Sequence, residues 1–174
     1  PQGAIISPVL ANMTLDGLEM AVKTSVSKNA KVNVIRYADD FVVTGESKEV
    51  LKEKVMPVIH AFLKERGLQL SGEKTKITRI EDGFDVLGQR VRKHREKFIT
   101  IPSKSAVKSL LAKIKKIVNA HLGQPTSTMI ESLNPVLRGW ANYHRHVCSK
   151  KTFGYIDTCI YAILWNWACR RHSN

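Results

Sequence analysis

Residues 31–45, KVNVIRYADDFVVTG, contain two runs of β-branched and aromatic residues separated by Ala38, Asp39 and Asp40. Side chains of the first kind favour strands, whereas alanine and aspartate disfavour them and aspartate is common in tight turns. The segment therefore predicts a β-hairpin that carries two adjacent carboxylates at its tip.

The two carboxylates permit two interpretations. Adjacent acids repel each other unless a cation neutralises them, and Mg²⁺ prefers a few carboxylates together with substrate phosphates. Two such ions about 4 Å apart support in-line nucleotidyl transfer. A hairpin tip with two acids can also be a solvated turn without any chemistry. Asp39 and Asp40 alone do not decide between these interpretations.

The elements around the hairpin follow from hydrophobic spacing and from turn residues. Apolar residues at helical intervals predict helices over residues 8–25 and 47–66, and Pro57 should bend or split the second. Short β-rich runs predict strands over residues 68–70, 75–80, 84–87, 89–91 and 97–101, and a basic turn lies between the last two. Beyond Pro102 only helices are predicted, over residues 103–121, 126–132, 134–147 and 153–171.

The predicted fold class is therefore α+β. Antiparallel strands with packed helices occupy residues 1–102, and an all-α bundle occupies residues 103–174. The composition is that of an ordinary globular protein, with 43% hydrophobic residues, which excludes a disordered chain. No apolar run approaches the roughly 18 residues that would cross a bilayer, so a membrane partner is not expected. Three cysteines without a C-x-x-C spacing predict neither a disulfide framework nor a standard zinc site.

Charge is distributed unevenly along the chain. The 174 residues include 28 Lys and Arg and 15 Asp and Glu, a formal net charge of +13. Residues 1–88 are balanced, with twelve basic and twelve acidic side chains, whereas residues 89–174 hold sixteen basic side chains and three acidic ones. A half as cationic as this indicates a polyanionic partner, and nucleic acid is the leading candidate. The alternative is a basic surface that only keeps the protein soluble.

Five sequence blocks, in order along the chain, resemble the motifs of one family. Residues 37–40, YADD, resemble the Y-x-D-D motif of reverse transcriptases. Three blocks resemble those that precede and follow it in the polymerase palm: residues 1–12 (PQGAIISPVLAN), 67–75 (GLQLSGEKT) and 84–88 (FDVLG). Residues 133–145, LNPVLRGWANYHR, resemble the signature of the maturase domain, also called X or thumb. The chain thus resembles the reverse transcriptase/maturases that group II introns encode.

This resemblance implies the end of a palm over residues 1–102 and a thumb/maturase X-like domain over residues 103–174. In the family an earlier palm strand carries the first catalytic aspartate, and the sequence contains no such block; Asp16, Asp82 and Asp85 do not replace it. We therefore expect a C-terminal fragment with two of the three catalytic carboxylates, which does not polymerise on its own.

The resemblance also implies roles for individual residues. Asp39 and Asp40 are the expected catalytic Mg²⁺ ligands, and Lys74 is expected near the nucleotide phosphates, where it neutralises the leaving pyrophosphate or protonates it. The expected substrate-binding residues are Gln2, Gly3, Tyr37 and Ala38. Tyr37 precedes Asp39 by two residues, a spacing that places both on one strand face. The plainer alternatives are a surface lysine at Lys74, core packing of Tyr37 and an ordinary turn at Gly3.

RNA contacts are expected from the basic half. Eight side chains on a hairpin tip and two helices are the candidates: Arg92, Lys93, Arg95, Lys104, Lys108, Lys115, Arg138 and Arg145. Each could instead belong to a solvated face. Trp140 is expected in the core rather than in base stacking.

The function implied for the whole protein is RNA-directed DNA polymerase and intron maturase. Such a protein binds group II intron RNA, assists its splicing and copies an RNA template from a DNA primer with dNTPs and Mg²⁺, as mobile introns require for homing. The expected compartment is the bacterial cytoplasm or an organellar matrix. The alternatives are a non-enzymatic RNA-binding splicing factor and an inactive relic.

Overall fold

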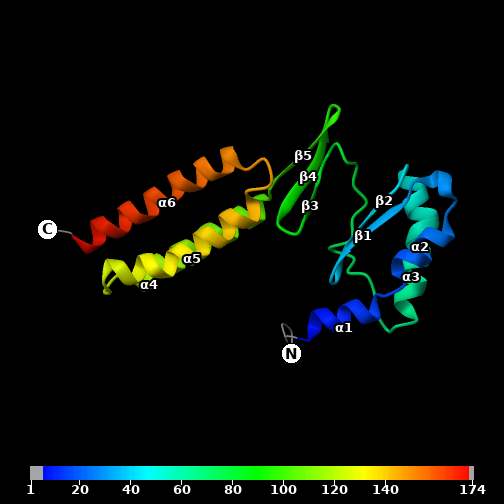
Figure 1. Cartoon of the computed structure of the whole chain (residues 1–174), viewed down its shortest axis with the longest axis horizontal. Helices are drawn as coiled ribbons and strands as arrows, with labels where there is room; N and C mark the ends of the chain where they lie inside the picture. Colours follow the sequence, from blue (N-terminus) through cyan, green and yellow to red (C-terminus); the bar gives the residue numbers. More distant parts are fainter. Residues whose placement is uncertain (1–5, 173–174) are drawn as a thin grey trace. The chain divides into compact units, whose positions relative to one another are not determined.

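The computed structural model describes residues 6–172. The predictions for Gln2 and Gly3 lie outside the described residues. The chain divides into two compact units, residues 1–77 and 78–174, and each is described here by itself (Figure 1). Helices and small antiparallel sheets occur together, which confirms a mixed α+β class.

The predicted hairpin is the centre of the first unit. Strand β1 (Asn33–Tyr37) pairs antiparallel with β2 (Asp40–Thr44), in a register that places Tyr37 opposite Asp40. Ala38 and Asp39 form a two-residue loop, and Ala38 has a positive φ of 53° whereas Asp39 does not. A positive φ at the first loop residue alone is the pattern of type II′ hairpin turns, which usually place glycine there.

The helices of this unit depart from the predictions at two places. The helix predicted over residues 8–25 is two helices, α1 (Ser7–Thr14) and α2 (Leu18–Ser25), because Gly17 takes a left-handed φ of 81° between them. The helix predicted over residues 47–66 does form, and its first part is a π-helix, η2 (Val50–Val55), that leads into α3 (Met56–Lys64). Pro57 lies in the first turn of α3, directly after η2, so the helix changes from π to α beside the proline.

Two predicted strands of the first unit do not form. Residues 68–70 and 75–80 are turns and irregular backbone, and their N–H groups bond locally, as from Leu68 to the Leu63 carbonyl. A short 3₁₀ helix, η1 (Lys28–Ala30), precedes β1. Helix α2 contacts α3, η2 and β1, and their apolar faces make the core. Its buried members are Leu15, Leu18, Val22, Ala30, Val32, Val34, Val55, Ile59, Phe62 and Leu63.

The second unit begins with a three-stranded antiparallel sheet. Its strands are β3 (Phe84–Val86), β4 (Gln89–His94) and β5 (Lys97–Pro102), in the order β3-β4-β5. The three strands confirm the runs predicted over residues 84–101. Strand β4 extends to His94, however, so Arg92 and Lys93 lie on the strand, and the predicted placement of both in the turn is wrong.

Three long helices follow the sheet (Figure 1). Helix α4 (Lys104–Ala120) confirms the helix predicted over residues 103–121, and the Ser103 hydroxyl caps it by accepting a 3.1 Å hydrogen bond from the Ala106 N–H. Helix α5 (Thr126–His144) is continuous, so the predicted break before Asn134 is wrong: Pro135 removes one hydrogen bond, while Met129 and Leu133 keep their buried positions. Helix α6 (Lys150–Arg171) begins three residues earlier than predicted.

The helical core joins all three helices. Helix α4 packs against both α5 and α6. The buried members are Leu110, Ile114, Val118, Met129, Leu133, Ile156 and Trp167. Trp140 is half-buried against this cluster, so part of its ring packs in the core as predicted and part stays open. Among the described residues, no helix combines the length and apolar character that crossing a membrane requires.

Candidate functional site

The hairpin tip presents both carboxylates to solvent. Asp39 and Asp40 are exposed, and no ion pair within residues 6–172 involves either of them. Tyr37 is 68% exposed, which excludes core packing within this chain. Because β1 ends at Tyr37, the strand alternation does not reach Asp39, and the predicted common face of these two residues is wrong. The side chain that shares a face with Tyr37 is that of Asp40, its partner in the register.

Arg36 connects this turn to helix α1. Its Nη1 donates hydrogen bonds to the Ala38 carbonyl (3.2 Å) and to Asn12 Oδ1 on α1 (2.7 Å). Asn12 ends the block at residues 1–12, and Arg36 precedes the YADD block. The bridge therefore joins two of the family-like blocks and fixes the left-handed residue Ala38 relative to α1.

Lys74 lies on a separate turn. The N–H groups of Lys74 and Thr75 donate to the Ser71 carbonyl at 3.2 and 2.9 Å, and the lysine side chain is exposed. No ion pair between the described residues joins Lys74 to Asp39 or Asp40. Nor do residues 6–172 contain any group of three or more His, Cys, Asp or Glu placed to hold a metal. The hairpin thus brings together Tyr37, Asp39 and Asp40, and the role of Lys74 beside them stays a prediction.

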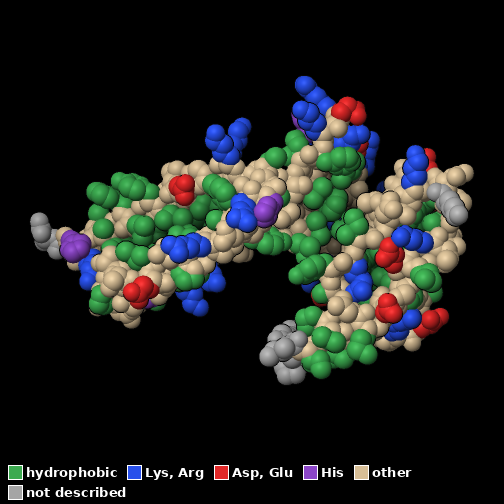
Figure 2. Space-filling model, viewed as in Figure 1, with side chains coloured by type: hydrophobic (Ala, Val, Ile, Leu, Met, Phe, Trp, Pro, Cys, Tyr) green, Lys and Arg blue, Asp and Glu red, His purple; other side chains and the backbone are tan. Residues whose placement is uncertain are grey.

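The candidate RNA-binding side chains of the second unit differ in their exposure to solvent and in their contacts with other side chains. Lys104, Lys108, Lys115, Arg138 and Arg145 are exposed on or beside α4 and α5, and Arg95 is exposed in the loop between β4 and β5. Figure 2 shows Lys and Arg side chains gathered at that hairpin tip.

Two strand residues of this set contact neighbouring side chains. Lys93 Nζ lies 3.9 Å from Glu96 Oε2. Arg92 is half-buried, its Nη2 is 3.4 Å from His94 Nδ1, and its buried Nε has no hydrogen-bond partner. Of the three cations predicted at this hairpin tip, Arg95 is therefore the one most available to RNA, because it is exposed whereas Arg92 and Lys93 are half-buried.

A second brace connects α5 to the turn between β3 and β4. The Tyr143 hydroxyl donates a 2.7 Å hydrogen bond to the Leu87 carbonyl, and the Ser103 N–H donates to the Gly88 carbonyl at 2.9 Å. Leu87 and Gly88 have positive φ values of 48° and 74°. Tyr143 belongs to the block at residues 133–145, and Leu87 and Gly88 end the FDVLG block. This bridge again joins two of the family-like blocks.

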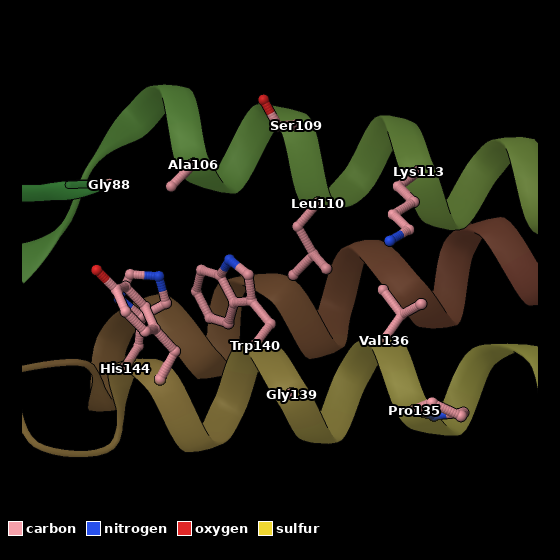
Figure 3. A pocket seen from close by; sticks show the side chains of 11 residues that line it. Gly88, Ala106, Ser109, Leu110, Lys113, Pro135, Val136, Gly139, Trp140 and His144 are labelled. Carbon is pink, nitrogen blue, oxygen red and sulfur yellow. The ribbon is translucent and has the colours of Figure 1, made fainter. Parts of the chain in front are cut away.

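An aromatic groove lies beside that brace (Figure 3). It has a volume of about 510 Å³. Its lining residues are Gly88, Ala106, Ser109, Leu110, Lys113, Pro135, Val136, Gly139, Trp140, Tyr143 and His144. In Figure 3 the Trp140 and His144 rings extend from α5 toward α4. The centroids of these two rings are 4.2 Å apart.

His144 is the most buried polar side chain of the groove. It is 1% exposed, and its Nδ1 has no hydrogen-bond partner within the described chain. Burial lowers the pKa of this imidazole below its usual value, because the charged form is poorly solvated there. At neutral pH the ring is therefore uncharged, with one nitrogen as a donor and the other as an acceptor.

Two family models match the chain. Residues 1–91 match the reverse transcriptase (RNA-dependent DNA polymerase) family, and residues 107–174 match the maturase-specific domain of group II introns. The chain belongs to the group II intron reverse transcriptase/maturases. The matches contain the YADD hairpin and the Tyr143 helix respectively, so each brace described above includes a residue from a recognised domain.

A curated relative of this reverse transcriptase/maturase chain is the protein YkfC of Escherichia coli (strain K12). The two are 30% identical over 144 residues, a match that covers 61% of this chain. The match covers 37% of YkfC, so the chain spans little more than a third of this relative's length.

Sequence reasoning missed four residues that the structure places at these sites. Arg36 and Asn12 brace the YADD turn, Tyr143 braces the FDVLG turn, and His144 lines the groove. All four lie in or next to the family-like blocks. The available signal was therefore the blocks themselves, whose polar members suggest contacts without naming the partners.

Proposed function

We propose that the whole protein is an RNA-directed DNA polymerase and maturase that binds group II intron RNA, assists its splicing and copies RNA into DNA. The observation that carries the proposal is the YADD hairpin. Two adjacent, exposed carboxylates stand at its tip, within a chain that belongs to the reverse transcriptases of group II introns. The balanced charge of residues 1–88 and the strong positive charge of residues 89–174 support a division between chemistry and RNA binding.

The donor set at the tip fits magnesium. Asp39 and Asp40 offer hard oxygen ligands that are open to solvent, so both can coordinate Mg²⁺ together with substrate phosphates. When bound there, Mg²⁺ supplies activation of the attacking 3′-hydroxyl and stabilisation of the leaving pyrophosphate. Tyr37, opposite Asp40, lines the primer end, and Ala38 presents backbone beside the incoming nucleotide. Lys74 holds the phosphates or gives a proton to the leaving pyrophosphate.

The domain division goes with this proposal. Residues 1–102 are the end of the palm, and residues 103–174 are the thumb/maturase part; the two family matches, which end at residue 91 and begin at residue 107, support that boundary. Intron RNA binds the exposed cations of the second part, while the RNA template, the DNA primer and dNTPs meet at the hairpin. This work takes place where the intron is transcribed, in the bacterial cytoplasm or an organellar matrix.

RNA-templated primer extension in Mg²⁺ tests the proposal. We expect the full-length protein to extend a DNA primer and Asp39→Ala to lower the rate by at least about 100-fold, since it removes a ligand of the charge-stabilising site. Asp16→Ala, another exposed carboxylate of the first unit, is the matched control and should retain activity. We expect the 174-residue chain alone to bind RNA without extending the primer.

Each other result has a definite meaning. Extension by the 174-residue chain that Asp39→Ala abolishes would show that two carboxylates suffice and would contradict the fragment interpretation. A full-length protein that promotes splicing but never extends a primer would favour the non-enzymatic splicing factor. RNA affinity that does not fall as salt rises would contradict phosphate binding by the basic half.

A further inference from the structure

The groove between α4 and α5 is open because small residues line it. Gly88, Ala106 and Gly139 stand where larger side chains would fill the space. Gly139 lies inside helix α5, where glycine is a poor helix former. A Cβ built on Gly139 would meet nothing within 4 Å, so close packing within the chain does not explain this glycine.

The walls of the groove offer aromatic surface and one buried polar atom. Trp140 and Tyr143 present rings, and the His144 ring lies against both, with centroid distances of 4.2 and 4.8 Å. His144 Nδ1 is buried without a partner, although buried polar atoms are almost always hydrogen-bonded. A flat molecule that enters the groove can stack on the rings and, after a small rotation of the His144 ring, pair with this nitrogen.

The rim adds a cation. Lys113 lines the groove from α4, and in Figure 3 its side chain extends toward α5. A nucleotide combines the matching parts, a flat base with polar edges and an adjacent phosphate. The volume of about 510 Å³ lies within the range of small-ligand sites.

We propose that this groove binds an unpaired purine of the RNA, which stacks on Trp140 and hydrogen-bonds His144 while Lys113 holds its phosphate. The inference rests on the proposed RNA binding and assigns it a specific base contact. RNA is favoured over a second copy of the chain because residues 89–174 hold sixteen basic and three acidic side chains, and two such surfaces repel each other. A purine offers more stacking area than a pyrimidine.

The test compares two RNA hairpins that differ in a single bulged position, which is an adenosine in one and an abasic nucleotide in the other. We expect the 174-residue chain to bind the adenosine hairpin about 10-fold more tightly, a difference of about 1.4 kcal/mol. Gly139→Leu places a side chain in the open space, and we expect it to remove that difference while affinity for the abasic hairpin stays unchanged. Ala106→Leu, from the α4 wall, should give the same loss.

Gly154→Leu is the matched control. Gly154 is also helical and exposed, a Cβ there also meets nothing within 4 Å, and it lies on α6 away from the groove. Gly139→Leu and Gly154→Leu should each keep or raise the melting temperature, because leucine favours helix more than glycine does. Gly154→Leu should keep the 10-fold preference.

Three outcomes would each contradict either the base-binding groove or the proposed RNA binding, and the experiment distinguishes them. A preference that survives in both Gly139→Leu and Ala106→Leu, or equal native affinity for the two hairpins, overturns the base-binding groove alone. A change of oligomeric state in Gly139→Leu, seen by sedimentation, overturns it in favour of a second copy as the occupant. Failure of the native chain to bind either RNA overturns the proposed RNA binding itself.

Discussion

Two tight hairpin turns carry the family blocks of this chain, and they are held in different ways. Both have two-residue loops that begin with a non-glycine residue at positive φ, Ala38 at 53° and Leu87 at 48°. The Ala38 carbonyl is held by Arg36, a neighbour two residues away that also reaches Asn12. The Leu87 carbonyl is held by Tyr143, which is 56 residues away on α5.

The difference in bracing matches a difference in task. The Leu87 turn is tied to helices that share a buried core, so the sheet and the helices of the second unit support each other. The Ala38 turn depends on one charged side chain and leaves its acids open to solvent. Exposed, adjacent carboxylates without internal partners contribute little to stability, but they are available to a metal and a substrate.

The largest effect is expected at the long-range brace. Tyr143→Phe removes the hydroxyl that bonds the Leu87 carbonyl and leaves the ring in place, so we expect a loss of about 1 kcal/mol in the unfolding free energy of the second unit. Urea unfolding of the chain measures it. Tyr161→Phe is the control, because Tyr161 is 67% exposed on α6 and its hydroxyl forms no hydrogen bond within the described residues. Equal effects of the two variants would show that the brace contributes nothing.

A smaller effect is expected at the arginine bridge. Arg36→Met and Asn12→Ala each break the 2.7 Å bond between α1 and the hairpin. A double-mutant cycle should give a coupling of about 0.5 kcal/mol, because ordering the long arginine side chain against an exposed asparagine costs conformational entropy. Amide hydrogen exchange at the YADD turn should rise in both single variants. A coupling larger than that of Tyr143 with its turn would reverse the comparison drawn above.

The sequence predicted the elements far better than it predicted these braces. Runs of β-branched residues located the hairpin at residues 31–45, and apolar spacing located the helix over residues 103–121, because both signals are local. Local signals also caused the errors. Proline after Asn134 resembles a helix start, yet the buried face of α5 continues through it. Periodicity failed at Gly17, where one left-handed residue divides a helical pattern.

The candidate site could be predicted only as a set of residue types. The resemblance assigned Asp39, Asp40 and Tyr37 to one place, and the register confirms that Tyr37 and Asp40 face each other. No local pattern reports that Tyr143 reaches Leu87 or that Arg36 reaches Asn12, since periodicity shows which side of an element is buried and not what it touches. Lys74 illustrates the same limit, because its role rests on the resemblance and no local pattern names the groups that its side chain contacts.

The smallest effect is expected in the pH dependence of stability that His144 causes. His144 directly follows Tyr143, the residue of the long-range brace. Its pKa is lowered by burial in the folded protein, whereas in the unfolded chain it returns to about 6.5. The unfolded state therefore takes up a proton first as pH falls, so stability should be fully present above pH 6.5 and decline below it. No acidic side chain lines the groove, and Lys113 on α4 acts in the same direction as burial.

His144→Gln isolates this contribution, because glutamine does not titrate and the other histidines are common to both proteins. Between pH 8 and pH 5 the native chain should lose stability relative to His144→Gln, as followed by urea unfolding at each pH. A constant difference across this range would mean that His144 takes up its proton equally in both states, which requires water to reach Nδ1 from the groove.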